Sequence, residues 1–445
     1  MISALREIVS GSGLKPQLIR GGLGNLALRT TFTLLTFGLG VLLARLMGAT
    51  AYGVYSYILA IIMVLAIPAQ FGLPALVVRE TAQSLTKKEW GRVRGLWQWG
   101  IRNTLFLTAI IAAGAFLFLL ISGDRIDHGY QEPLYWGLVL LLLLAFSSLV
   151  GAALRGLHKI IYGQLSEQVL VPGFFILFVL AAVFIYSQKI SPSLAIRLQA
   201  LAALCALAIC APLLWLSTPK EIKKARPVFE HKTWLSSLFS LSLISGMQVI
   251  NKWVSILILG FFVPAAQIGI YRVAVQMAVL ADFGLQVINP VIAPQIARLY
   301  TMGDVKRLQS LATQSARVVL FFNLIITVGF ILFGRQFIRI FYGPEFSSSY
   351  YVLLILLVGG LVNSFVGSVG YLLNMTGHER ETLQSRVVAT LSFIVLALLL
   401  SPLLGIYGAA ISSSVSLIVW NVLLWRLVRK LLNINSLAFG RNVTS

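Results

Sequence analysis

Charge is scarce in this 445-residue chain, and acidic charge is the scarcer kind. Only 11% of the residues are charged, with 14 acidic against 35 basic side chains, whereas soluble domains carry about 25% charged residues. Hydrophobic residues make up 58% of the chain, and its mean hydropathy is +0.90. This composition excludes an ordinary soluble globular protein and indicates a chain that lies in a bilayer.

Other absences narrow the class further. The two cysteines, Cys205 and Cys210, lie in one apolar segment, which excludes a disulfide framework and a metal site. The phosphate-binding pattern Gly-x-x-x-x-Gly-Lys-Ser/Thr is missing, so ATP coupling by this chain is not expected. The longest polar gap, 218–232, is too short to hold a soluble domain. We expect no cofactor and no enzymatic activity.

The sequence is rich in apolar runs of the length that crosses a bilayer, roughly 20 residues each. Backbone groups in lipid must be hydrogen-bonded within the segment, and these runs do not alternate as barrel strands do, so helices follow. The uncharged stretch 387–425 is too long for one crossing, and Ser401-Pro402 with Gly405 divides it. We predict twelve spans, over residues 22–46, 52–78, 99–122, 133–154, 168–187, 197–217, 236–261, 265–292, 316–334, 349–374, 386–403 and 406–428.

Basic residues gather in alternate gaps between these spans. One set of gaps, counted with both termini and the adjoining span ends, holds 27 Lys and Arg, the other set holds 6, and Lys252 and Arg272 lie well inside spans. Because cytoplasmic loops are enriched in Lys and Arg, both termini are predicted to face the cytoplasm. The same rule explains the net charge of +21 without a nucleic-acid partner. Residues 1–20 are mildly amphipathic and predict a short interfacial helix, not a cleavable signal peptide.

The second half of the chain partly repeats the first at an offset of 216 positions. Tyr52-Gly53-Val54-Tyr55 corresponds to Ile268-Gly269-Ile270-Tyr271, and Pro74 corresponds to Pro290. A coincidence of apolar sequence is the alternative. Six helices per half give a parallel repeat about an axis along the membrane normal. We therefore predict an all-α polytopic membrane protein with a central cavity between an N-terminal lobe (1–217) and a C-terminal lobe (236–445), joined by a basic cytoplasmic linker (218–235).

Several short motifs carry a family resemblance. Ala44-Arg45-Leu46-Met47-Gly48 with the Tyr52 motif, and Leu404-Gly405-Ile406-Tyr407-Gly408-Ala409-Ala410, resemble the first hairpin and the last helix of the Wzx-type O-antigen and exopolysaccharide flippases. These belong to the multidrug/oligosaccharidyl-lipid/polysaccharide flippase superfamily, and the resemblance covers nearly the whole chain. It implies an inverted V of two six-helix lobes that moves undecaprenyl-pyrophosphate-linked oligosaccharide across the plasma membrane for polysaccharide biosynthesis. Many relatives have an Asp where this chain has Lys252, so cation coupling through such an Asp is not implied.

Five ionisable residues in the predicted spans are candidates for the site. Arg29 and Arg45 lie on the first span, Lys252 near the middle of the seventh, and Arg272 and Asp282 on the eighth. Lys252 lies about 15 Å from its outer helix end at 1.5 Å per residue, so it must face water, a partner or a ligand. Each of the other four has an alternative explanation. Arg45 lies at the outer helix end, where it can contact lipid headgroups, and Arg29 and Arg272 are near enough to helix ends for their side chains to snorkel to the interface. Asp282 can serve as the counter-charge of a basic residue. Asp282 and Arg272 do not share a helix face, so no pair between them is expected.

If the four basic residues line one chamber, its charge suits an anionic headgroup. Arg grips pyrophosphate oxygens bidentately, Lys offers a point charge, and the polyprenyl tail stays in lipid. Asp282 is the candidate for H+ or Na+ coupling. The expected partners are the lipid-linked glycan, membrane lipids, a polysaccharide polymerase and glycosyltransferases. Two other functions stay open: a multidrug cation antiporter, which would need buried carboxylates, and a membrane glycan polymerase or ligase, which would need a large catalytic outer loop.

Overall fold

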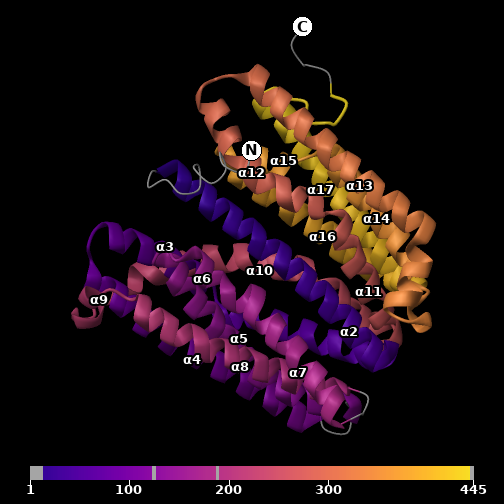
Figure 1. Ribbon diagram of the computed structural model, residues 1–445, viewed down its shortest axis with the longest axis horizontal. Coiled ribbons are helices and arrows are strands. Elements are labelled where there is room, and N and C mark those ends of the chain that lie inside the picture. Colours follow the sequence, from indigo (N-terminus) through magenta and orange to yellow (C-terminus); the bar gives the residue numbers. More distant parts are fainter. Residues whose placement is uncertain (1–13, 123–126, 187–189, 441–445) are drawn as a thin grey trace. The chain divides into compact units, whose positions relative to one another are not determined.

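The computed structural model describes residues 14–122, 127–186 and 190–440, and within these ranges the chain is helical and has no strand. The interfacial helix predicted for residues 1–20 falls mostly outside the described residues. The helices are labelled in Figure 1: α2 (Leu14–Gln70), α3 (Leu73–Thr86), α4 (Trp90–Ser122), α5 (His128–Gly156), α6 (Ile160–Leu165), η2 (Ser166–Leu170), α7 (Val171–Tyr186), α8 (Pro192–Ser217), α9 (Lys220–Lys224), α10 (His231–Phe262), α11 (Ala265–Ala281), α12 (Phe283–Thr301), α13 (Val305–Phe341), η3 (Pro344–Phe346), α14 (Ser349–Val366), α15 (Val369–Met375), α16 (Glu379–Leu404) and α17 (Ile406–Leu432).

The predicted spans all lie on this series of helices. Among the described residues, ten helices are long and apolar enough to cross a membrane, and α11 with α12, bent by 42°, makes an eleventh. α2 consists of two helices joined at Gly48, where φ is 76° and ψ is 171°, and so supplies the first two predicted spans. The predicted break after Ser401-Pro402 is present as well, because Gly405, with a φ of 57°, separates α16 from α17. The all-helical polytopic prediction is confirmed.

Turn and capping residues set the ends of these helices. α3 begins after Gly72, whose φ of 74° suits glycine, and Pro74 stands in its first turn, where a missing N–H costs nothing. Ser191 and Asp304 accept hydrogen bonds from N–H groups in the first turns of α8 and α13, at 3.2 and 3.0 Å. Such caps satisfy donors that have no partner inside the helix.

The chain forms two compact units. Unit 1 comprises Met1–Met47 and Val54–Val254, and unit 2 comprises Gly48–Gly53 and Ser255–Ser445. In unit 1, α5 packs against α3, α4 and α8; in unit 2, α14 packs against α11, α13 and α17 (Figure 1). α10 contributes its residues up to Val254 to unit 1 and the rest to unit 2. These units are defined by contacts and are not continuous in sequence. They therefore do not test the lobe boundaries predicted around 218–235, which stay a prediction.

The internal repeat is visible in the helix boundaries. Adding 216 to the bounds of α4, 90–122, gives 306–338, which lies within α13. Adding 216 to the bounds of α8, 192–217, gives 408–433, which matches α17 within two residues. Gly48, the joint inside α2, corresponds to Pro264, which separates α10 from α11. The offset read from a few identities therefore relates whole elements, which argues against a coincidence of apolar sequence.

Within unit 2, the two repeat-related glycines pack against each other's helices. A Cβ on Gly53 would lie 1.7 Å from the carbonyl oxygen of Ala265, and a Cβ on Gly269 would lie 2.3 Å from that of Ala49. Both helices carry an Ala-x-x-x-Gly pair, the small-residue spacing that lets membrane helices approach closely. At the offset of 216, Ala49 corresponds to Ala265 and Gly53 to Gly269. Each glycine therefore packs against the alanine of the other helix, the reciprocal arrangement expected of helices related by a two-fold axis.

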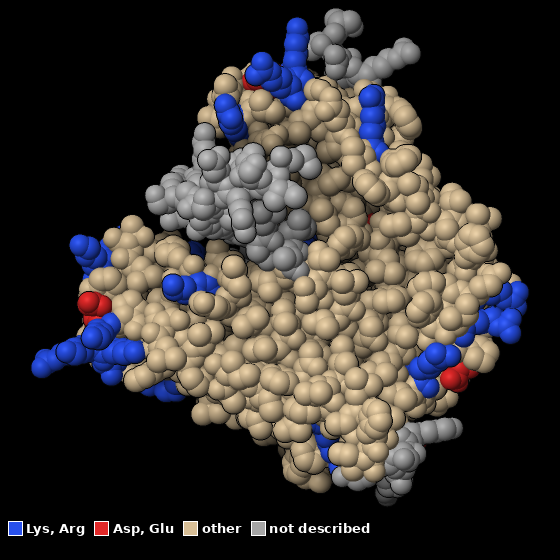
Figure 2. All heavy atoms as spheres, in the orientation of Figure 1, with Lys and Arg blue, Asp and Glu red and all other residues tan. Residues whose placement is uncertain are grey.

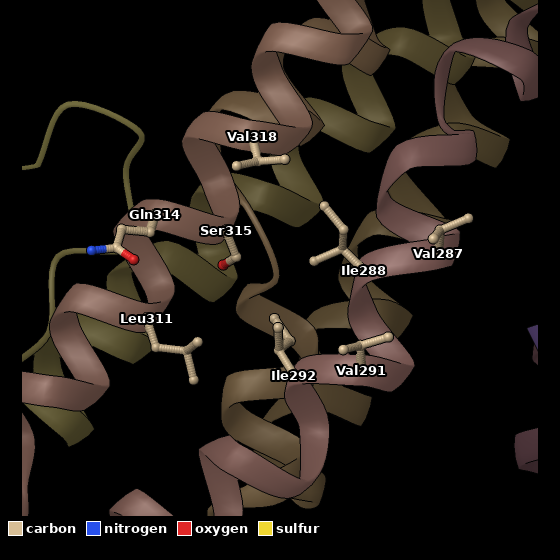
Figure 3. Close-up of a pocket in the computed structure, with 8 residues that line it drawn as sticks. All are labelled: Val287, Ile288, Val291, Ile292, Leu311, Gln314, Ser315 and Val318. Atoms are coloured by element: carbon tan, nitrogen blue, oxygen red, sulfur yellow. The ribbon is translucent and has the colours of Figure 1, made fainter. Parts of the chain in front are cut away.

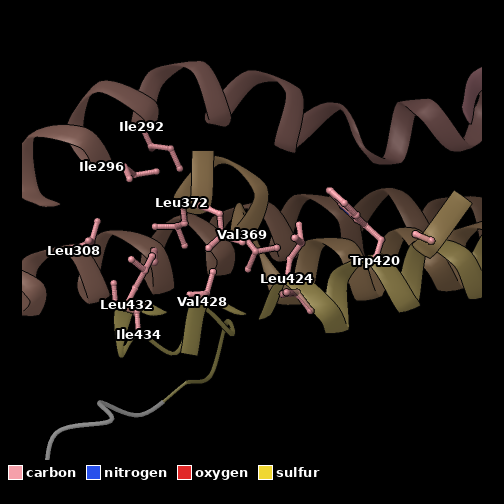
Figure 4. Packing of buried hydrophobic residues seen from close by; sticks show 14 residues of the cluster. Ile292, Ile296, Leu308, Val369, Leu372, Trp420, Leu424, Val428, Leu432 and Ile434 are labelled. Atoms are coloured by element: carbon pink, nitrogen blue, oxygen red, sulfur yellow. The ribbon is translucent and has the colours of Figure 1, made fainter. Parts of the chain in front are cut away.

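Each unit has an apolar core at corresponding positions. The core of unit 1 includes Trp99 and Trp234, whose ring centroids lie 5.2 Å apart. The core of unit 2 runs along α12, α13, α15 and α17 and includes Trp420 (Figure 4). Three residues of the first core, Leu76, Leu96 and Ala153, correspond at the same offset to residues of the second, Ile292, Ala312 and Val369.

The outer surfaces of the described helices are apolar. Phe184, Phe261 and Leu403 are 87%, 79% and 80% exposed, and each lies on or at the end of a predicted span. On the face shown in Figure 2, most of the surface is uncharged, and acidic side chains are scarcer than basic ones. Exposed apolar area on this scale marks a surface that lies against lipid.

Candidate functional site

The five ionisable residues of the predicted site fall into two groups. Arg29, Arg45 and Lys252 belong to unit 1, and Arg272 and Asp282 belong to unit 2. That Arg272 and Asp282 do not pair with each other, as their spacing indicates, stays a prediction. A single chamber lined by all of these residues stays a prediction.

Lys252 lies deep within α10. It follows His231 by 21 positions and precedes Phe262 by 10. Its side chain is exposed, whereas Trp253 beside it is buried, and the ammonium nitrogen lies 5.5 Å from the centroid of the Trp253 ring. This distance is within the range of a cation–π contact. A charge exposed to acyl chains at this depth would cost at least about 2.5–3.5 kcal/mol, which favours an aqueous or anionic surrounding for Lys252.

The two arginines of α2 differ in exposure. Arg29 is half-buried, and its carbonyl oxygen accepts a hydrogen bond from the hydroxyl of Thr33 at 2.9 Å. Arg45 is exposed and stands three residues before the break at Gly48. A position next to a helix end is where a guanidinium reaches headgroups without crossing apolar lipid. Arg29 is thus the better candidate of the two for a role within the span.

Arg272 belongs to a cluster of aromatic side chains in unit 2. It is half-buried on α11 and hydrogen-bonded to the hydroxyl of Tyr52, which also donates to Gln276 at 3.4 Å. Tyr342, just after the α13 span, is buried, and that burial raises the pKa of its hydroxyl, an effect that the charge of Arg272 partly offsets. Phe346 packs edge-on against Tyr52 with ring centroids 6.2 Å apart. These contacts give Arg272 a packing role in addition to any contact with substrate.

Asp282 stands where α11 ends and α12 begins, at the 42° bend between them. Its Oδ1 accepts a hydrogen bond from the side-chain amide of Asn363 on α14 at 3.4 Å. Gly360, one turn away on α14, leaves room beside this carboxylate, since a Cβ there would lie 3.5 Å from the same Oδ1. The carboxylate is thereby held next to two helices of unit 2.

A polar network on α13 and α14 lies next to this carboxylate. The amide of Asn323 donates to the carbonyl oxygen of Gly360 at 3.3 Å and to the hydroxyl of Ser364 at 2.6 Å. Thr327 donates to the Oδ1 of Asn323 at 3.0 Å. Asn323, Thr327 and Ser364 are buried in otherwise apolar spans. The search of the sequence for charged residues missed this network, although asparagines inside apolar runs are its signal.

The other repeat shares only part of this network. At the offset of 216, Asp282, Asn323 and Thr327 correspond to apolar residues of unit 1, namely Ala66, Leu107 and Ile111, whereas Asn363 and Ser364 correspond to Ser147 and Ser148. Because unit 1 reaches an equivalent helical arrangement without the carboxylate and the amides, the fold does not require those groups. A buried polar cluster that the fold does not require is a candidate for function.

Arg386 is the first residue of the predicted span 386–403. α16 begins earlier, at Glu379, so Arg386 lies two turns inside the helix. It is half-buried, and its guanidinium carbon lies 3.7 Å from the centroid of the Trp420 ring on α17. Unit 2 therefore holds a further cation within a span, stacked on an aromatic face.

An apolar surface hollow of about 300 Å³ lies between α12 and α13 of unit 2 (Figure 3). Ile288 and Ile292 of α12 point toward Leu311 and Ser315 of α13, and Gln314 points away. No ionisable side chain lines this hollow. It is therefore unsuited to an anionic headgroup and does not belong to the candidate site.

Comparison with known proteins gives matches along most of the chain. The family model described as "Polysaccharide biosynthesis protein" matches residues 19–300. The chain is 21% identical over 383 residues to the "Probable low-salt glycan biosynthesis flippase Agl15" of Haloferax volcanii, a match that covers 85% of this chain and 77% of that protein. It is 28% identical over 200 residues to the "Probable flippase AglR" of the same organism, covering 44% of this chain and 40% of that protein.

Solved structures of the same fold come from two kinds of transporter. An inward-facing multidrug resistance MATE family transporter of the MOP superfamily matches with a TM-score of 0.74 over 90% of this chain and 94% of that one. The lipid II flippase MurJ in an inward closed conformation matches with a TM-score of 0.72 over 91% and 87%. Each is 15% identical to this chain. These matches establish the two-lobed helical fold, and they do not distinguish the two activities.

Proposed function

This chain belongs to the polysaccharide biosynthesis protein family, and on that premise we propose that it is a flippase for lipid-linked oligosaccharide. The family model covers more than half of the chain, and both curated relatives described above are named as flippases. The proposed substrate is an oligosaccharide on undecaprenyl pyrophosphate, carried across the plasma membrane for O-antigen or exopolysaccharide assembly. A polymerase and glycosyltransferases are the proposed partners in that pathway.

The observation that carries this proposal is the exposed, basic side chain of Lys252 far inside α10. In the proposal it contacts the pyrophosphate while the headgroup passes the apolar part of the bilayer. Arg29 and Arg272 supply further positive charge along the path, and Arg45 acts near its end. A cationic path favours an anionic headgroup and disfavours the cations that a multidrug antiporter exports.

The direction of transport follows from the charge of the substrate. With both termini in the cytoplasm, as the basic gaps predict, the substrate is loaded from a compartment that is normally negative. Moving a doubly charged headgroup outward then releases roughly 4–5 kcal/mol per 100 mV. The empty, positively charged carrier must return against the same field. We propose that H+ or Na+ bound at Asp282, beside Asn363, assists this return by alternating access of the two lobes.

The test compares three substitutions at one position. Lys252→Ala should lower export of lipid-linked glycan about tenfold or more in a flippase-deficient host, because one charge-assisted contact is worth about 1.5–3 kcal/mol. Lys252→Arg should retain much of the activity, and Lys252→Glu should abolish it. Lys232→Ala, near the start of the same helix, removes an exposed positive charge and serves as the matched control. Protein level in the membrane is measured for each variant.

Two outcomes would contradict the proposal. Export by Lys252→Glu at the wild-type rate would show that the path needs no positive charge at this position. Uptake of a fluorescent cationic dye by proteoliposomes, driven by a proton or sodium gradient and unaffected by lipid-linked glycan, would indicate the multidrug antiporter instead.

A further inference from the structure

A groove of about 450 Å³ lies on unit 1, where the ends of α4 and α8 meet the short helix α9. One wall is apolar and is formed by Ala211, Leu214 and Trp215 of α8. Trp215 is 65% exposed, and the next residue, Leu216, is 71% exposed. Aromatic and aliphatic side chains at the end of a span contact the region where headgroups meet acyl chains. The apolar wall therefore suits the upper part of a lipid tail.

Two basic side chains line the other part of this groove. The Nη1 of Arg94 donates to the carbonyl oxygens of Lys223 and Ala225 at 2.6 and 2.9 Å. Its Nε and Nη2 make no hydrogen bond to any other described residue, so they remain available to an acceptor in the groove. The ammonium of Lys223 lies 3.9 Å from the centroid of the Trp215 ring, which holds the charge at the apolar wall.

No described carboxylate neutralises this pair of basic groups. Neither Arg94 nor Lys223 forms an ion pair with a described acidic residue. The polar gap that surrounds the groove, 218–232, holds five basic and two acidic residues. The groove thus combines an apolar wall with uncompensated positive charge, at the membrane face that the basic gaps predict to be cytoplasmic.

These two basic residues have no basic counterparts at the repeat-related positions. At the repeat offset of 216, Arg94 and Lys223 correspond to Ser310 and Phe439 in unit 2. The C-terminal segment packs onto the helices there as the linker does in unit 1, since the N–H of Ala438 donates to the carbonyl oxygen of Phe365 at 3.0 Å. In unit 2 it is Arg317 that donates to this segment, at the carbonyl oxygen of Ala438 and 2.7 Å, so the basic side chains at the two places stand at different positions of the repeat.

We propose that this groove binds the headgroup of an anionic phospholipid of the cytoplasmic leaflet. The phosphate contacts the free nitrogens of Arg94 and the ammonium of Lys223, and an acyl chain lies against Trp215 and Leu214. Basic pockets between membrane helices on the cytoplasmic side are known binding places for acidic lipid headgroups. None of the residues that line this groove belongs to the transport path proposed above, and the proposal does not depend on that function.

The test measures lipid binding to the purified full-length protein by native mass spectrometry. The protein is titrated with phosphatidylglycerol or with phosphatidylcholine of the same chain length. Phosphatidylglycerol should bind more tightly, and Lys223→Gln should weaken its binding about fivefold, the effect of removing one basic residue from an anionic lipid surface. Lys224→Gln removes the same charge from the same helix but outside the groove, and should change binding less than about twofold. Trp215→Ala should also weaken binding, because it removes the wall and the support of Lys223.

Several results would overturn the proposal. Equal binding of the two lipids to the wild type would exclude a headgroup site. Equal losses in Lys223→Gln and Lys224→Gln would show a diffuse effect of the linker charge. Displacement of phosphatidylglycerol by undecaprenyl phosphate at much lower concentration would assign the groove to the substrate lipid instead. Export activity is not the readout, so failure here is distinguishable from failure of the flippase assignment.

Discussion

The contact of Gly53 with Ala265 in unit 2 gives the most direct test of the repeat. Gly53→Ala would place a Cβ 1.7 Å from the carbonyl oxygen of Ala265, whereas carbon and oxygen atoms in ordinary close contact lie about 3.3–3.6 Å apart. The two helices must therefore separate locally by well over 1 Å. The obstacle is a backbone carbonyl, so a rotamer change cannot relieve it. Overpacking of this kind costs about 1–3 kcal/mol or more.

The matched control, Gly38→Ala, changes another glycine of the same helix, α2. A Cβ on Gly38 of α2 would have no atom within 4 Å. Gly38→Ala should therefore stabilise the helix by up to about 1 kcal/mol through alanine's higher helix propensity. The same propensity gain acts in Gly53→Ala, so the difference between the two variants isolates the clash. Melting of the purified protein in detergent should show Gly53→Ala about 1–3 °C or more below Gly38→Ala.

The reciprocal substitution sharpens this test. Gly269→Ala would place its Cβ 2.3 Å from the carbonyl oxygen of Ala49, and should destabilise the protein in the same direction. Once one substitution has separated the helices, the second meets less resistance, so the double variant should lose less than the sum of the single losses. Equal melting temperatures for Gly53→Ala and Gly38→Ala would refute the close contact. Strictly additive losses would refute the shared interface.

Two further predictions concern carboxylates. Asp282→Asn keeps the size of the side chain but removes its charge, so export in proteoliposomes should lose its dependence on a proton or sodium gradient; an unchanged dependence would remove Asp282 from coupling. Glu80 is 4% exposed and accepts from Arg79 at 3.0 Å and Arg92 at 2.8 Å, so Glu80→Ala should destabilise unit 1 by about 2–3 kcal/mol in a melting experiment. Glu89→Ala removes an exposed partner of Arg92 and should cost less than about 1 kcal/mol; equal effects would contradict a special role for the buried carboxylate.

Much of the fold was accessible from the sequence because membrane helices are specified locally. The apolar runs gave the helical spans, and Gly405 marked the break between the last two. The basic gaps predicted an orientation, and a handful of identities gave the offset that relates α4 to α13 and α8 to α17. Each of these signals depends on neighbouring residues and on the requirement that backbone groups in lipid bond within their own segment.

The parts that the sequence did not reveal depend on contacts between distant segments. The Ala-x-x-x-Gly pairs at Ala49 and Ala265 are visible in the sequence, but only the packing shows that they meet. Asn323 and Asn363 carry no charge, so a search for ionisable groups passed over them, although they surround Asp282 and its neighbour Gly360. Arg386 begins the predicted span 386–403, but its contact with the Trp420 ring depends on the packing of α16 against α17.

The repeat separates what the fold needs from what the function adds. Residues that hold the helices together recur at the offset of 216, as Gly53 and Gly269 do. The ionisable candidates do not recur: Arg29, Lys252, Arg272 and Asp282 correspond to Ser245, Thr36, Ser56 and Ala66. A charged side chain within a span costs free energy, and the equivalent helix of the other repeat folds without that charge. A purely structural role would therefore have to explain why only one of the two repeats includes it. Replacing Lys252 by threonine, the residue that its counterpart uses, should therefore leave the melting temperature near that of the wild type while it lowers export, and a variant that loses stability and export together would assign Lys252 to the scaffold.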